Sequence, residues 1–173
     1  TLSFAELLAS GAVLSPVKLR AKDLPDVTLD PKAHRYYTTH PLSELAPYTT
    51  LAAGEIQITG VFGGELHRIR TTLVARPYDE LRWLDALCKS HGRLNPKLDP
   101  GGSYSIRHAF GAAPELRGHS RIAALMATTM ALHDIARTSG CHMEEVFDIV
   151  NAYNAIGRIE YIPRQRLQPK AST

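Results

Sequence analysis

Two places in this chain combine side chains that bind metal ions or act as nucleophiles. Cys88 and His91 are three residues apart, and Cys141 is followed directly by His142. Thiolate and imidazole are the usual ligands of structural zinc, but paired ligands normally have a few residues between them, and adjacent side chains point in different directions. We therefore expect no metal site and no cofactor.

Two further arrangements could in principle support catalysis. The dipeptide His133-Asp134 resembles the paired residues of metal-dependent phosphohydrolases, a family that needs more His and Asp ligands on other helices. Ser103 with His108, like the first cysteine-histidine pair, joins a nucleophile to a base. Neither pair has an identifiable oxyanion turn or a third orienting group. The sequence predicts no catalytic residue, and we expect a protein that is not an enzyme.

From Ser120 onward, apolar residues recur at the spacing of two helices that meet at Gly140. The two runs are Ile122, Leu125, Met126, Thr129, Leu132, Ile135 and Ala136, then Val146, Ile149, Val150, Tyr153 and Ile156. Ala136 would allow close approach of the helix backbones, and Gly140 would supply a positive φ at the corner. Residues 119–139 contain no Gly or Pro, so one long helix or a plain helical hairpin also fits the pattern.

The spacing of Ala136, Gly140, Val146 and Ile149 resembles that of the helix-turn-helix family. Residues 158–162 alternate like a strand directly behind the second helix, which resembles the winged-helix branch, where a hairpin and a basic loop follow the recognition helix. The resemblance spans about residues 120–170. It implies a winged-helix-like module that contacts duplex DNA, and a homodimer is compatible with it because two-fold symmetry matches paired half-sites.

The resemblance also implies which side chains would touch DNA. Basic residues of this region would contact phosphates, and polar residues around the start of the second helix would lie near base edges. The expected phosphate contacts are Arg137, Arg158, Arg164 and Arg166, and the residues nearest to bases are Ser139, His142 and Asn151.

The same helix also carries three acids, Glu144, Glu145 and Asp148. Carboxylates repel a phosphate lattice, although they also suit a helix N-terminus because they complement its dipole. The alternative function is therefore a protein-interaction adaptor, or a subunit of a larger assembly, in which helix 142–156 docks on a basic partner.

The N-terminal part is expected to contain a hairpin and a helix after a start rich in loops. Five prolines between residues 15 and 50 exclude a long helix there. Alternating residues on both sides of Gly63-Gly64 predict a hairpin over 55–74, and an apolar face bounded by Pro77 and Gly92 predicts a helix over 77–91. The fold class is α+β, with one domain over 1–113 and a C-terminal module with a basic tail over 114–173.

Composition adds a few broad limits. The chain has 173 residues, of which 44% are hydrophobic and 21% charged, and its net charge of +3 permits an acidic partner without requiring one. Two cysteines do not indicate a disulfide scaffold. No run of residues has the length and apolarity of a membrane-spanning helix or the pattern of a secretory signal, so we expect a cytoplasmic protein without membrane contact.

Overall fold

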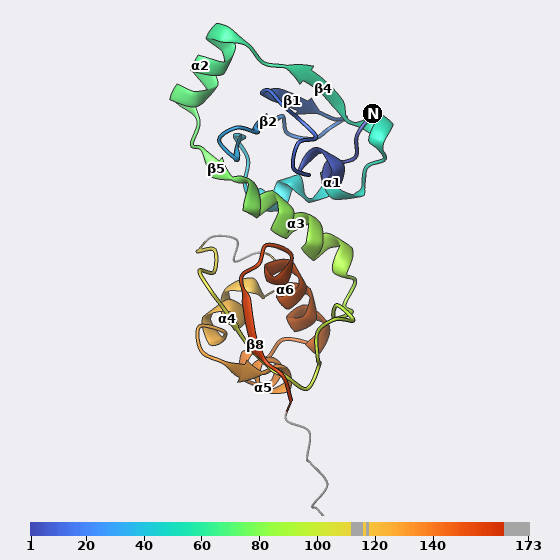
Figure 1. Cartoon of the computed structure of the whole chain (residues 1–173), viewed down its shortest axis with the longest axis vertical. Coiled ribbons are helices and arrows are strands. Elements are labelled where there is room, and N and C mark those ends of the chain that lie inside the picture. Colours follow the sequence, from blue (N-terminus) through green and yellow to red (C-terminus); the bar gives the residue numbers. More distant parts are fainter. Residues whose placement is uncertain (112–115, 117, 165–173) are drawn as a thin grey trace, which may run out of the picture. The chain divides into compact units, whose positions relative to one another are not determined.

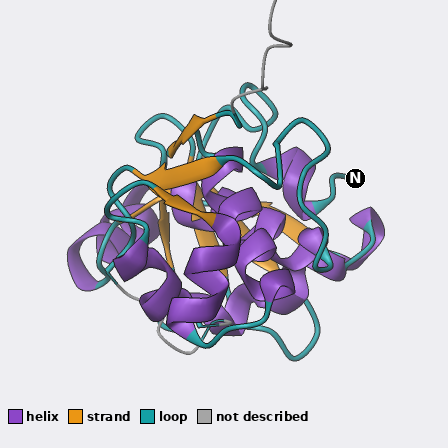
Figure 2. Ribbon diagram, turned by 90° about the horizontal axis from the view of Figure 1, so that it is seen from below, coloured by secondary structure: helices purple, strands orange, loops and turns teal. Residues whose placement is uncertain are grey.

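The computed structural model of the chain describes residues 1–111, 116 and 118–164. It has both helices and antiparallel sheets, which is the α+β class (Figure 2). Contacts divide the chain into two compact units, Thr1–His91 and Gly92–Thr173. This division lies about twenty residues before the expected boundary at Ala113, because the strand at Ser103–Ile106 pairs only with later strands.

The first unit is built on a five-stranded antiparallel sheet with the strand order β4-β1-β2-β3-β5. The strands are β1 (Val17–Arg20), β2 (Val27–Asp30), β3 (Arg35–Tyr37), β4 (Gln57–Gly60) and β5 (Arg76–Pro77). The helices are α1 (Phe4–Leu7), α2 (Gly63–Thr72) and α3 (Tyr78–Ser90), with 3-10 segments η1 (Leu42–Thr50) and η2 (Ala53–Glu55). The start expected to be rich in loops therefore supplies three of the five strands.

The core of the first unit lies where α1, η1 and α3 pack together beside the sheet. Leu19, Leu29 and Leu45 are fully buried there, and the Phe4 and Tyr48 rings stack with their centroids 5.7 Å apart. The Tyr48 hydroxyl donates a hydrogen bond of 2.6 Å to the carbonyl oxygen of Pro25. Burial of these large side chains is the main source of stability in this half of the chain, because its loops contribute little.

The predicted hairpin over 55–74 is wrong. Strand β4 pairs with β1 instead, and Gly63–Thr72 forms helix α2 (Figure 1). Leu66, Ile69 and Leu73 follow one another at steps of three and four residues, which is one face of a helix, and they pack against Tyr37 and Val61. Helical spacing of these three residues outweighed the turn signal of the glycine pair. The predicted helix over 77–91 is confirmed as α3, which His91 ends with a left-handed φ of 52°.

The described residues of the second unit form three helices and a three-stranded antiparallel sheet of order β7-β6-β8. Its elements are β6 (Ser103–Ile106), α4 (His119–Leu125), β7 (Met130–Ala131), α5 (Leu132–Ser139), α6 (Met143–Ala155) and β8 (Ile159–Ile162). The alternative of one long helix before Gly140 is wrong, because β7 separates α4 from α5. The strand expected behind the second helix is present as β8, and its partner β6 precedes all three helices in the sequence.

Candidate nucleic-acid interface

The turn between α5 and α6 is formed by Gly140 and the two residues that follow it. Gly140 adopts a φ of 72° and donates its backbone N–H to the Ala136 carbonyl oxygen at 3.1 Å. Ile135, Val146 and Ile149 are fully buried on the facing sides of the two helices. Two helices that meet at a left-handed glycine, as the sequence predicted, are therefore present.

Strand register places α5 and the end of β8 at the same end of the second unit. Ser103 of β6 pairs with Ala131 on one side and with Ile162 on the other. Helix α5 begins directly after Ala131, and Arg164 lies two residues beyond Ile162, as Figure 1 shows for the two elements. We call the exposed basic side chains at this end, His133, Arg137 and Arg164, the sheet-end surface.

The two arginines of the sheet-end surface are largely open to solvent. The side chain of Arg137 is 76% exposed and that of Arg164 is 64% exposed. Each also has an acidic neighbour: Arg137 Nη2 lies 2.6 Å from Asp134 Oδ1, and Arg164 Nη2 lies 2.9 Å from Asp99 Oδ1. Exposed ion pairs of this kind are weak and exchange readily for other anions. Both guanidinium groups can therefore reach a phosphate.

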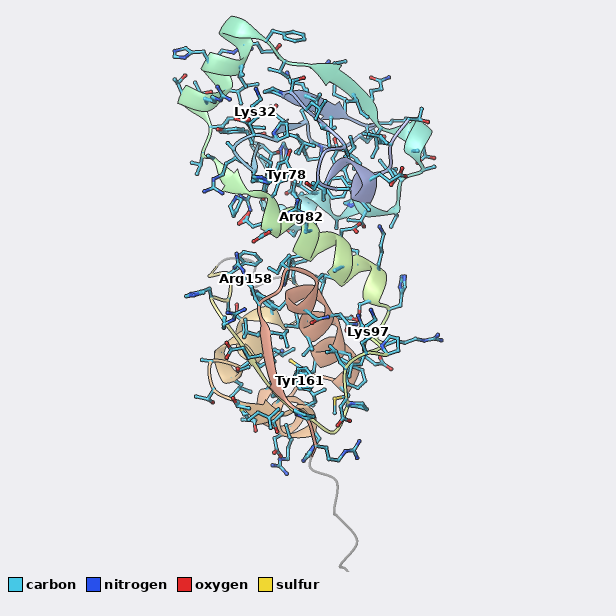
Figure 3. The ribbon with its side chains drawn as sticks, in the orientation of Figure 1. Lys32, Tyr78, Arg82, Lys97, Arg158 and Tyr161 are labelled. Carbon is cyan, nitrogen blue, oxygen red and sulfur yellow. The ribbon has the colours of Figure 1, made fainter. Side chains whose placement is uncertain are left out.

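Arg158 lies at the opposite end of the same sheet. Its Nη1 donates a hydrogen bond of 2.8 Å to the His108 carbonyl oxygen, and its guanidinium lies 4.6 Å from the centre of the Phe110 ring. Arg164 follows it six positions later, and six steps of extended chain correspond to about 20 Å. The expected cluster of C-terminal arginines is therefore split, and Arg166 lies outside the described residues. Figure 3 labels Arg158, which directly precedes β8, and Tyr161 within β8.

Two of the three residues expected nearest to bases, Ser139 and Asn151, form hydrogen bonds within the chain. Ser139 is 8% exposed, accepts a hydrogen bond from the Cys141 backbone N–H at 3.1 Å and donates one to Ala136. Asn151 accepts from the Asn95 backbone N–H at 2.8 Å, and its amide donates to the carbonyl of residue 93 at 2.6 Å. Ser139 shapes the turn, and Asn151 fixes the segment before β6 against α6. His142 is exposed immediately before α6.

The acidic residues of α6 also differ in their surroundings. Asp148 is 5% exposed and accepts a hydrogen bond of 2.8 Å from the Gly92 backbone N–H, so it is not available for docking. Glu144 is exposed and Glu145 is half-buried. Helix α6 contains no Lys or Arg, so its first turn presents negative charge alone.

A buried contact without any signal in the sequence joins α4 to α6. His119 is 1% exposed, and its Nε2 lies 2.5 Å from the Tyr153 hydroxyl, which also accepts a hydrogen bond from the Phe110 backbone N–H. Burial raises the pKa of Tyr153 to about 12. The phenol stays protonated at neutral pH, so it can hydrogen-bond to His119 and tie α4 to α6.

Charge is distributed unevenly between the two units. Residues 1–91 contain ten Lys and Arg and ten Asp and Glu, whereas residues 92–173 contain ten Lys and Arg but only seven acids. The whole net charge of +3 therefore belongs to the second unit. A positive balance attracts polyanions, in agreement with the position of the candidate interface.

The described part of the chain gives little support for a metal site or for a membrane-spanning helix. No group of three or more His, Cys, Asp or Glu side chains lies close enough there to hold a metal ion. Cys88 and Cys141 are free thiols. Within the described ranges, no helix has the length and apolar character needed to cross a membrane.

Comparisons with protein-family models, with characterised proteins and with solved structures found no match to this chain.

Proposed function

We propose that this protein is a non-enzymatic, DNA-associated regulatory or accessory protein whose second unit contacts the phosphates of duplex DNA. The observation that carries the proposal is the pair α5 and α6 around Gly140, with β7 before it and β8 after it. Arg137 and Arg164 are exposed at the same end of this arrangement. A helix-turn-helix places its second helix in the major groove while neighbouring cations hold the backbone.

The proposed contacts distinguish little between different DNA base sequences. Ser139 and Asn151 are already engaged within the chain, and α6 has no Lys or Arg to read guanine. Glu144 could accept from cytosine only after cations had secured the backbone, because a carboxylate otherwise repels the phosphates. We therefore expect salt-sensitive binding with weak base preference, with His142 as the remaining candidate near a base edge.

The test is an anisotropy titration of a labelled random-sequence duplex at several salt concentrations. The double variant Arg137→Ala/Arg164→Ala should weaken binding and reduce the slope of log K against log salt by about 2, one for each phosphate contact. Arg107→Ala is the matched control: it removes an exposed arginine that pairs with Glu160 at 3.2 Å, at the other end of β6. The absence of binding at low salt, or equal losses in both variants, would reject the proposal.

A second candidate function is that of an adaptor for a basic protein partner. The acidic first turn of α6 favours it, because Glu144 is exposed there and no cation lies on the helix. In this case a Lys- and Arg-rich peptide should bind the protein, and Glu144→Gln/Glu145→Gln should abolish binding. Glu160→Gln, which changes an exposed acid on β8, is the control. Peptide binding without DNA binding would favour the adaptor.

A further inference from the structure

Strand β4 forms one edge of the five-stranded sheet in the first unit (Figure 1). The Val61 backbone N–H donates to the Pro16 carbonyl oxygen at 3.0 Å, so the backbone of Val61 faces β1. Backbone groups of an antiparallel strand alternate between its two sides, so Ile58 and Gly60 direct their N–H and C=O groups away from β1. Among residues 1–91, all of which the structure describes, no strand pairs with this outer side. These donors and acceptors can therefore pair with a strand of another chain.

Strand β4 also lacks the residues that usually protect an edge strand from such pairing. Prolines and charged side chains are the common means of protection. Residues 56–62 contain neither. By contrast, β5 at the opposite edge of the same sheet consists of Arg76 and Pro77, and β8 in the second unit is followed directly by Pro163. Of these three edges, β4 is the one open to pairing.

Two exposed apolar side chains lie beside the outward backbone groups of β4. Phe62 is 73% exposed, and its ring covers Gly60, because a Cβ added at that glycine would lie 2.5 Å from Phe62 Cζ. Ile58 is 36% exposed and pairs opposite the buried Leu19. Side chains two positions apart share a face of a strand, so Ile58 lies on the face where the Phe62 ring covers Gly60. The edge therefore combines unpaired backbone groups with an apolar surface.

We propose that β4 pairs with β4 of a second copy of this chain, antiparallel and with Thr59 on the two-fold axis. Residues 56–62 are extended at both ends, with φ −101° and ψ 118° at Ile56 and φ −131° and ψ 157° at Phe62. An alignment centred on Thr59 gives each residue of this segment a partner in the other copy. It sets the outward-facing Ile58 against the outward-facing Gly60, so the two residues exchange hydrogen bonds. Each copy uses the same surface, as two-fold symmetry requires.

Side chains on both faces of the strand suit this alignment. Ile58 of one copy lies opposite Gly60 of the other and meets the Phe62 ring that covers it, which removes apolar surface of both copies from water. On the opposite face, the two Thr59 side chains lie across from each other, and threonine pairs of this kind stabilise sheets through their hydroxyls. The absence of a side chain at Gly60 leaves the space that the neighbouring ring fills.

Charge also favours a second copy as the partner. The alignment directs Glu55 of one copy toward Gly63 of the other, where α2 begins without a side-chain cap. Glu55 is exposed, and the space at Gly63 and Gly64 is open, because a Cβ added at either glycine would meet nothing within 4 Å. A carboxylate is stabilised at a helix N-terminus. Within residues 56–62 no charges oppose each other, since the segment is uncharged.

The test is sedimentation equilibrium of the full chain without DNA, at concentrations that cover Kd values from about 10 µM to 1 mM. The contact is smaller than the about 20–30 residues a side of a standard stable interface, so we expect a weak and reversible dimer. The mass should rise from that of one chain toward that of two. A mass of one chain at every concentration, or growth beyond two, would overturn the proposal. All contacts lie in the first unit and DNA is absent, so the outcome is independent of the proposed function.

Two alanine variants test the apolar contact. Phe62→Ala removes the ring that meets Ile58 of the other copy, so we expect the Kd of the dimer to rise about tenfold or more. Val74→Ala is the matched control, because Val74 is 77% exposed and lies outside β4. It should leave the Kd unchanged. Equal effects of the two variants would indicate non-specific association of apolar surfaces and would overturn the proposal.

Cysteine cross-linking tests the register. The two Thr59 residues form a non-hydrogen-bonded pair on the axis, with their Cα atoms about 4.5 Å apart, which suits a disulfide. Thr59→Cys should therefore oxidise to a covalent dimer, in a Cys88→Ser background that removes a partly exposed thiol. Gln57→Cys changes the same face of β4, but the alignment separates the two copies of this position by about 13 Å, so it should not cross-link. Equal cross-linking of both variants, or of neither, would contradict the proposed pairing.

Discussion

Arg164 folds back onto Asp99 and so joins the end of β8 to the turn that precedes β6. Its Nη2 lies 2.9 Å from Asp99 Oδ1, and its backbone N–H donates to Asp99 Oδ2 at 3.3 Å. The guanidinium also covers Gly101, since a Cβ added at that glycine would lie 2.5 Å from the Arg164 Cζ. The same arginine that we propose as a phosphate contact therefore holds two chain segments together in the absence of DNA.

This contact predicts a measurable change in the titration of Asp99. The hydrogen bond from Arg164, with a smaller contribution from the Gly101 backbone N–H, holds the pKa of Asp99 below its ordinary value. Arg164→Ala should raise that pKa but not restore it fully, because the Gly101 contact remains. Side-chain carboxyl carbon shifts measured by NMR across the acid range test this expectation. Arg107→Ala, at the other end of β6, should leave the Asp99 titration unchanged.

The lowered pKa of Asp99 makes the stability contributed by its contact with Arg164 depend on pH. A carboxyl whose pKa is lower in the folded protein stabilises the fold above its unfolded pKa, and this contribution is lost as the pH falls through the folded value. The stability difference between the wild type and Arg164→Ala should therefore shrink on acidification. A difference that stays constant down to the lowest pH would show that Asp99 is not the partner that matters.

Gly140 offers a test of the turn between α5 and α6. Its φ of 72° is unfavourable for a side chain, although an added Cβ would meet nothing within 4 Å. Gly140→Ala should therefore lower the free energy of unfolding by about 1 kcal/mol through backbone strain alone. Gly140→Asn should cost less, because asparagine tolerates this conformation better. Urea denaturation measures both, with Gly54→Ala, also in open space but without a positive φ, as the control.

Local patterns predicted the helices of this chain better than its strand pairings. The α5–α6 turn was predictable because Gly140 and the flanking apolar residues lie within about twenty positions. The prediction of a hairpin over 55–74 failed because the helical face of Leu66 and Ile69 was not weighed against the glycine turn, and its packing partner Tyr37 lies far away in the sequence.

The roles of individual site residues were harder to predict than the elements that carry them. The burial of Asp148 depends on the Gly92 backbone, fifty-six residues away, and no periodicity shows such a contact. Nothing in the sequence distinguishes Tyr78 from the other residues of the helix over 77–91, because the burial of its hydroxyl without a partner among the described residues is a property of the fold. Hydrogen bonds between residues far apart in the sequence therefore determine which candidate side chains remain available for binding.

The pair Asp30 and Arg70 joins the sheet to α2 and gives a test of that packing. Asp30 is 2% exposed, and Arg70 Nη2 lies 2.6 Å from its Oδ2. Arg70→Met leaves the buried Asp30 carboxylate without its cation, so the free energy of unfolding should fall. Adding Asp30→Asn to this variant should recover part of the loss. A double-mutant cycle by urea denaturation measures the coupling, and additive effects would contradict the role assigned to the pair.

Three buried tyrosines predict how stability changes at high pH. Burial raises the pKa values of Tyr48, Tyr78 and Tyr153 to about 12 each, above the unfolded value near 10. Stability from these phenols is fully present below the unfolded pKa, and it is lost as the pH rises from about 10 toward 12. Urea denaturation at a series of alkaline pH values, with tyrosinate absorbance recorded in parallel, measures this loss.

Replacing one of these phenols should reduce the alkaline loss of stability. Tyr48→Phe removes an ionisable group, so its free energy of unfolding should fall less steeply between pH 10 and 12 than that of the wild type, even though the variant loses the hydrogen bond to Pro25 at neutral pH. Tyr161→Phe changes a side chain that is 45% exposed and should leave the slope unaltered. Equal slopes for the wild type and Tyr48→Phe would mean that ionisation of this buried phenol does not limit stability at high pH.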